Sequence, residues 1–151
     1  MKFNPKVIFI GGIAMYASQF LASMLTGPFI HEGVLTPLYM ETQAFWRPEL
    51  NQQPPDMAAL MPRWITVGLI TTFIIAGIYD KIRPALEGSG LVKGLKFGVI
   101  AWLFSLCFSA GWSGVYNRPE MIWVWWNAEF LLMYLLGGAV LGLVTGKLAP
   151  E

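Results

Sequence analysis

One carboxylate and two amides lie within otherwise apolar stretches of this 151-residue chain. Glu129 and Asn127 lie in the segment MIWVWWNAEFLLMYLLGGAVLGLVTGK, residues 121–147, and Gln19 lies in the first apolar segment. An ionised carboxylate in such surroundings is costly, so Glu129 must be protonated, paired with an arginine that reaches inward, or in contact with water. The chemistry open to it is proton exchange or the binding of a polar ligand group.

The depth of these residues places them near one another. At ~1.5 Å rise per residue, Glu129 lies roughly 12 Å below the outer end of its segment and Gln19 roughly 15 Å below the outer end of its own. The sequence therefore predicts a polar ligand pocket in the outer half of the protein, formed by Gln19, His31, Arg63, Arg118, Asn127 and Glu129. The alternative is that Gln19, Asn127 and Glu129 only join neighbouring helices by hydrogen bonds.

His31 and Glu32 are adjacent, an arrangement that would suit acid–base or metal chemistry. The sequence has a single histidine, which is too few for a typical zinc site or a bis-histidine haem site. The lone Cys107 excludes a thiol relay that needs paired cysteines. We predict no metal site and no catalytic residue, and the residues identify no cofactor. A simpler role for His31 is that of an interfacial residue capping the loop.

Four long apolar segments must position these groups. The sequence is 56% hydrophobic and 13% charged, whereas soluble domains have roughly 25% charged residues. The segments cover about residues 7–29, 61–82, 91–112 and 121–147, and each is long enough to cross a ~30 Å hydrocarbon core. We predict one membrane domain, residues 1–151, folded as an all-α four-helix bundle with up-down-up-down topology. Pro28 should end the first helix, because proline cannot continue a helix.

A connector from residue 30 to 62 joins the first two segments on the outer side. Thr36 and Pro37 resemble an N-cap followed by a proline at the first helical position, and Pro48 would end the helix that follows. We expect a short interfacial helix in this long outer loop. Three roles are open for residues 39–49, namely a lid, a docking surface or an interfacial anchor, and the anchor is favoured.

Basic residues and tryptophans are unevenly distributed between the two sides of the segments. Seven of the ten basic residues fall on one side, namely Lys2, Lys6, Lys81, Arg83, Lys93, Lys96 and Lys147. Because short cytoplasmic loops carry the excess of lysine and arginine, we expect a bacterial inner-membrane protein with both termini in the cytoplasm. Six of the seven tryptophans lie toward the opposite side, which predicts a tryptophan-rich outer interface.

Glycines recur at every fourth position late in the last segment, at Gly138, Gly142 and Gly146. This pattern, a glycine zipper, lets helix backbones approach closely, so we expect contact with another helix in the same chain or in a second copy. At ~100° per residue, Asn127 shares the glycine face and Glu129 points the opposite way. Since neither face suits lipid, we predict a homo-oligomer or a larger membrane complex through the glycine face.

Composition narrows the function. The net charge of +1 provides no field that would attract nucleic acid, and membrane lipid is the expected surrounding partner. The sequence favours a non-catalytic role, as an accessory or assembly subunit or as a binder of a hydrophobic ligand in the outer-half pocket. The alternative is a proton- or solute-coupled transport component in which Glu129 titrates. A membrane enzyme acting on lipid is the third hypothesis.

Overall fold

The computed structural model describes residues 2–149, and every regular element in that range is a helix. Four helical stretches are long and apolar enough to cross a membrane, namely Val7–Val34, Met57–Ala85, Gly90–Ser113 and Glu120–Leu148. This confirms the prediction of an all-helical protein with four candidate spans, as expected for a multi-pass membrane protein.

The first stretch is built from η1 (Val7–Gly11), α1 (Gly12–Gly27) and η2 (Pro28–Val34). The connector contains α2 (Thr36–Glu41), η3 (Gln43–Phe45) and η4 (Pro48–Asn51). The remaining elements are α3 (Met57–Ile82), η5 (Arg83–Ala85), α4 (Gly90–Ser113) and α5 (Glu120–Leu148).

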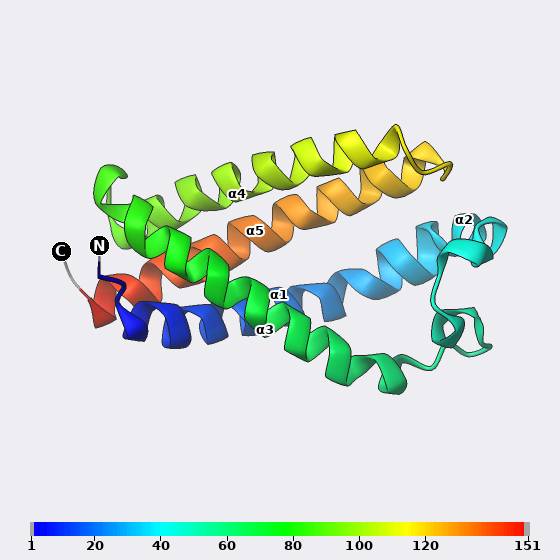
Figure 1. Ribbon diagram of the computed structural model, residues 1–151, viewed down its shortest axis with the longest axis horizontal. Helices are drawn as coiled ribbons and strands as arrows, with labels where there is room; N and C mark the ends of the chain where they lie inside the picture. The colour runs from blue at the N-terminus through cyan, green and yellow to red at the C-terminus, as the bar shows by residue number, and fades with distance from the viewer. Residues whose placement is uncertain (1, 150–151) are drawn as a thin grey trace.

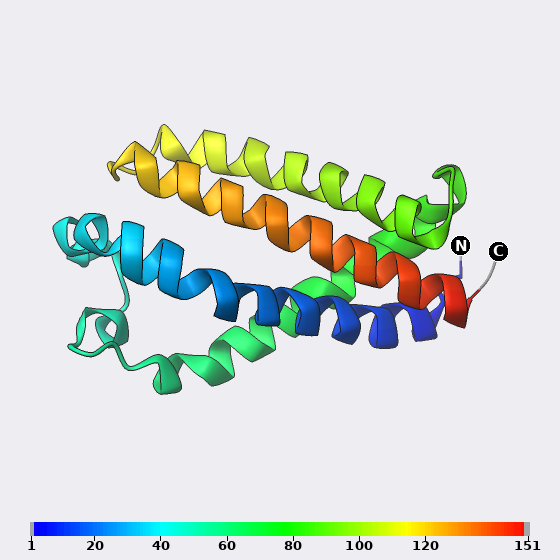
Figure 2. The same ribbon diagram turned by 180° about the vertical axis from the view of Figure 1, so that it is seen from behind.

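The four long helices extend along the longest axis of the molecule (Figure 1). The segments leading to both termini lie at one end, and α2 with the rest of the connector lies at the other. Seen from behind, α5 lies between α4 and α1 (Figure 2). The first turns of α3 lie apart from the other helices, and α3 then crosses α1 obliquely. The end that holds the connector is therefore the more open end of the molecule.

Glycines bring α4 and α5 into close contact. A Cβ added to Gly94 would lie 2.1 Å from the carbonyl oxygen of Gly138, and one added to Gly142 would lie 2.1 Å from that of Gly90. Gly138 and Gly142 are buried, whereas Gly146 is exposed. Of the two neighbours expected for this face, a helix of the same chain or one of a second copy, α4 of the same chain covers Gly138 and Gly142. The reason is that α4 carries its own glycines at matching positions.

The first spanning helix does not end at Pro28, contrary to the sequence prediction. It continues as the π-helix η2, in which the Leu35 amide donates to the carbonyl of Ile30, five residues earlier, at 2.8 Å. A proline clashes with the carbonyl four residues before it in a regular α-helix, and the wider π turn accommodates it. This extension carries His31 toward α5.

The connector and α3 also begin differently from the prediction. The Thr36 hydroxyl is no N-cap, because it donates back to the carbonyls of His31 and Glu32. α3 begins at Met57, where the Asp56 carboxylate accepts a hydrogen bond from the Ala59 amide at 3.1 Å. The cap explains why α3 begins before the expected residue 61.

A buried aspartate joins the elements at the end of the molecule that holds the termini. Asp80 is 7% exposed and accepts a hydrogen bond from the backbone amide of Asn4 at 3.0 Å. It pairs with Lys81 at 3.0 Å and with Arg83 at 3.6 Å. Arg83 also donates to the carbonyl of Ala149 at 2.7 Å. The end of α3 therefore holds both the N-terminal segment and the residue that follows α5.

Candidate functional site

Glu129 is a buried carboxylate in the first half of α5, with 4% of its surface exposed. Both of its oxygens are hydrogen-bonded. The Thr26 hydroxyl, near the end of α1, donates to Oε1, and Nε2 of His31 lies 2.9 Å from Oε2. Burying a carboxylate is costly unless it is paired and hydrogen-bonded, and here the first spanning stretch supplies both partners.

His31 connects this carboxylate to the connector. Its Nδ1 lies 2.7 Å from the Tyr39 hydroxyl, which also accepts a hydrogen bond from Nε1 of Trp126 at 2.8 Å. An indole only donates and an ionised carboxylate only accepts, so the network assigns the protons of a neutral imidazole. Tyr39 donates to Nδ1, and Nε2–H donates to Glu129. We call these residues, with Thr26, the Glu129 cluster.

The order carboxylate, imidazole, hydroxyl is also that of a nucleophilic triad. The Tyr39 hydroxyl does not suit that role. Burial, together with the charge of Glu129, raises the pKa of Tyr39 to about 12 even though the Trp126 hydrogen bond acts in the opposite direction. A lowered pKa is one way in which a nucleophile is activated, and burial shifts the pKa of Tyr39 in the opposite direction. The Glu129 cluster is therefore a hydrogen-bonded connection between segments rather than an activated nucleophile.

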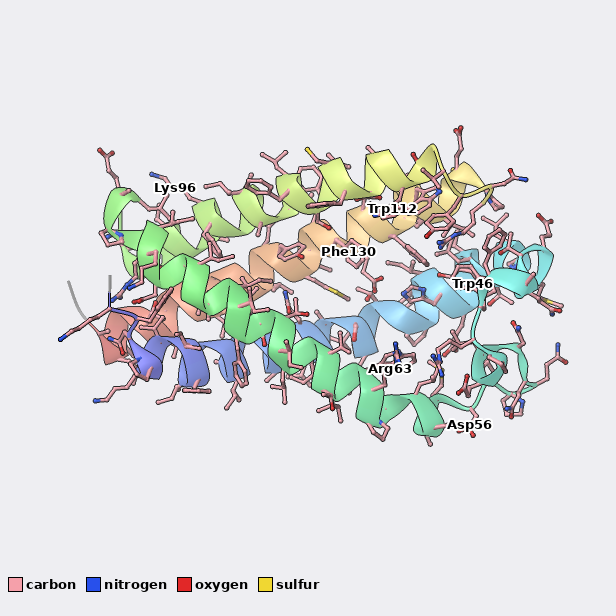
Figure 3. The ribbon with its side chains drawn as sticks, in the orientation of Figure 1. Trp46, Asp56, Arg63, Lys96, Trp112 and Phe130 are labelled. Carbon is pink, nitrogen blue, oxygen red and sulfur yellow. The ribbon has the colours of Figure 1, made fainter. Side chains whose placement is uncertain are left out.

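Arg118, just before α5, is surrounded by aromatic rings. Its Cζ lies 4.9–5.7 Å from five ring centroids, those of Phe45, Trp46, Tyr116, Trp123 and Trp126. Trp46 packs edge-on against Trp126 at 5.8 Å and donates to the carbonyl of Tyr39 at 3.1 Å. Trp46, at the connector end of the molecule in Figure 3, and Trp126 thus link Arg118 to the Glu129 cluster.

An open cavity of ≈ 1000 Å³ lies beside Arg118. One wall is formed by Glu41 and Thr42 of the connector, and the other by residues 113–120 with the first turns of α5. Neither Glu129 nor His31 lines this cavity. The Glu129 cluster therefore holds one wall in place but does not itself enclose the space for a ligand.

Asn127 lies on the opposite side of α5 from Glu129. Its Nδ2 donates to the Ser109 hydroxyl and to the Trp123 carbonyl, both at 2.7 Å. The backbone carbonyl of Asn127 accepts a hydrogen bond from Nε1 of Trp102 at 3.0 Å. Asn127 therefore joins α5 to α4 on the glycine face, where the helical periodicity placed it.

Gln19 and Arg63 also lie outside the Glu129 cluster. Nε2 of Gln19 lies 3.4 Å from the carbonyl of Met133, about one turn deeper than Glu129, so it joins α1 to α5. Arg63 is exposed on the part of α3 that lies apart from the bundle (Figure 3), and it has no hydrogen bond or ion pair with any residue in 2–149. The six predicted residues therefore do not form one pocket. Glu129 and His31 are in contact, and Arg118 is connected to them through aromatic rings.

Three members of the Glu129 cluster were not among the predicted site residues, namely Thr26, Tyr39 and Trp126. Thr26 is only a hydroxyl in an apolar segment and was not singled out, and Trp126 was counted only among the interfacial tryptophans. The π turn brings His31 to the same side as Thr26, five residues earlier, and such a turn leaves no clear pattern in a sequence.

No protein-family model, curated protein or solved structure matches this chain.

Proposed function

We propose that this chain is a non-catalytic binding or accessory component of the bacterial inner membrane, and that it binds its ligand or partner in the cavity beside Arg118. The observation that carries this proposal is the bonding of the Glu129 cluster. It fastens the connector, which forms one wall of the cavity, to α5, which forms part of the other.

The chemistry of the cluster supports a binding role over a catalytic one. Both oxygens of Glu129 are already hydrogen-bonded, and its surface is 4% exposed. The Tyr39 hydroxyl already takes part in hydrogen bonds with His31 and Trp126, and burial raises its pKa. An enzyme acting on lipid would need an acid or base in contact with substrate, and Glu129 and His31 do not line the cavity.

In this proposal the four long helices cross the membrane up-down-up-down, with both termini in the cytoplasm and α2 at the outer interface. The basic residues Lys2, Lys6, Lys81 and Arg83 belong to the end with the termini, which suits the cytoplasmic side. The aromatic residues around Arg118 belong to the opposite end, which suits the outer interface.

The test is purification of the full chain from native membranes in mild detergent, followed by native mass spectrometry. The wild type should retain a bound lipid or protein. Glu129→Ala should release it, because the connector wall is no longer held. Glu32→Gln is the matched control, since Glu32 is an exposed carboxylate one residue from His31. Equal retention by Glu129→Ala, with the connector shown to be loosened, would contradict the proposal.

A second candidate is a proton-coupled transport component, and the chain of proton-exchanging groups from Tyr39 through His31 to Glu129 favours it. Against it, the side chains of Met15 and Leu141, buried between α1 and α5 beyond Gln19, are apolar. Liposomes containing a pH-sensitive dye distinguish the two. A proton flux that Glu129→Gln abolishes without unfolding the protein would favour transport and contradict the binding role.

A further inference from the structure

We propose that the cavity beside Arg118 binds the head group of an aminophospholipid. The phosphate would bind the Arg118 guanidinium, and the ammonium would bind the carboxylates of Glu41 and Glu120. This assignment rests on the proposed binding role of the cavity and specifies the class of its ligand.

Arg118 has unused hydrogen-bonding capacity. Its side chain makes no hydrogen bond or ion pair with any residue in 2–149, and its Nε is buried without an acceptor. The surrounding rings stabilise the positive charge, but a ring face does not replace the oxygen acceptors that the guanidinium N–H groups require. Nε1 of Trp123, another residue that lines the cavity, is also buried without an acceptor. A phosphate oxygen supplies the missing acceptors, and the planar fork of arginine suits it.

The cavity carries charges of both signs. Arg118 lines it together with Glu41 and Glu120, and both carboxylates are exposed and form no ion pair with Arg118. A small multivalent anion would be repelled by the two carboxylates. A phosphodiester that carries an ammonium group matches both signs, so the lining favours a zwitterionic head group over a free phosphate.

The position of the cavity favours a lipid as the source of that phosphate. It lies where α4 and α5, two apolar candidate spans, are joined by their turn. Val115 and Val124 contribute apolar surface to its lining, and Trp123 contributes an aromatic ring. In the proposed topology this is the depth of lipid head groups, where tryptophans concentrate.

The test is a titration of intrinsic tryptophan fluorescence, because Trp46, Trp123 and Trp126 surround Arg118. The full chain in detergent is titrated with short-chain phosphatidylethanolamine, with phosphatidylglycerol of the same chain length, and with inorganic phosphate. We expect a saturable response to phosphatidylethanolamine that Arg118→Gln weakens by about tenfold or more, since charge-assisted hydrogen bonds are lost. Arg63→Gln, which removes an outer-side arginine away from the cavity, should leave the response unchanged.

A second pair of substitutions tests the ammonium contact. Glu41→Gln combined with Glu120→Gln should weaken the response to phosphatidylethanolamine, and it should not weaken that to phosphatidylglycerol, because the removed carboxylates repel an anion. Both residues are exposed, so this variant decides the matter even if Arg118→Gln does not fold.

Three results would overturn the assignment. If phosphatidylglycerol bound the wild type as tightly as phosphatidylethanolamine, the proposed ammonium contact would be refuted. A response to inorganic phosphate alone would identify a free anion as the ligand. A flat response to every lipid, while Glu129→Ala still releases a bound protein from the purified chain, would refute the lipid and leave the binding role intact.

Discussion

Glu129→Gln tests whether the Glu129 cluster holds the connector against α5. Glutamine keeps the size of the side chain but places an amide where the carboxylate accepts from both Thr26 and His31. Hydrogen bonds to a charged group are worth roughly 1.5–3 kcal/mol and neutral ones roughly 0.5–1.5 kcal/mol. Part of this loss is offset because a charge no longer has to be buried. We therefore expect the connection to weaken by about 1–3 kcal/mol.

Hydrogen exchange of α2 measures this loss directly. The amide of Tyr39 donates to the carbonyl of Leu35 at 2.9 Å, and that of Thr42 donates to the carbonyl of Tyr39 at 3.1 Å. Where reclosing is faster than exchange, a loss of 1–3 kcal/mol accelerates exchange roughly 5- to 150-fold. The amides of α4 should be unaffected, and Glu32→Gln should behave as the wild type. Unchanged exchange in a folded Glu129→Gln protein, or equal acceleration by Glu32→Gln, would refute the reasoning.

Two further predictions concern helix packing and alkaline pH. Gly94→Ala places a Cβ 2.1 Å from the Gly138 carbonyl oxygen and should destabilise the protein by about 1–3 kcal/mol or more in thermal unfolding. Gly111→Ala, in the same helix with nothing within 4 Å of the added Cβ, should be neutral or stabilising by up to about 1 kcal/mol, and a similar loss for both would contradict the packing. Because burial raises the pKa of Tyr39 from 10.0 to about 12, the folded protein holds this proton more tightly than the unfolded chain does. Its stabilising contribution should be complete below pH 10 and disappear as the pH rises through 12, a decline in unfolding free energy that Tyr39→Phe should lack.

The four long helices could be predicted because a membrane-spanning helix is recognised from the length of its apolar run alone. The same is true of the face of α5 that carries Asn127, because α5 is a regular α-helix with a fixed angle per residue. Periodicity identifies a face but not its neighbour. The sequence therefore left open whether α4 or a second chain would cover Gly138 and Gly142. In the structure α4 covers them, because its own glycines allow the two backbones to approach closely.

The contact between His31 and Glu129 could not be predicted in the same way. Proline was expected to end the first helix, which placed His31 in a loop, whereas the π-helix η2 carries it to the carboxylate. Arg63 was placed at the pocket because depth along each helix was treated as if the helices were parallel. α3 instead begins apart from the bundle, so equal depth does not bring its residues close to α5.

Asp80 and Glu129, two buried carboxylates, differ in which parts of the molecule they join. Asp80 pairs with Lys81 and Arg83, its neighbours in sequence, and accepts from the Asn4 amide, so it reinforces the end of the molecule where the helices converge. Glu129 is bound by Thr26 and His31, which precede it by 103 and 98 residues. Its bonds therefore fasten the first spanning stretch to α5, and through His31 and Tyr39 they also fasten the connector. Loss of these bonds should release the connector without unfolding the bundle, because the contact between α4 and α5 lies on the opposite face of α5.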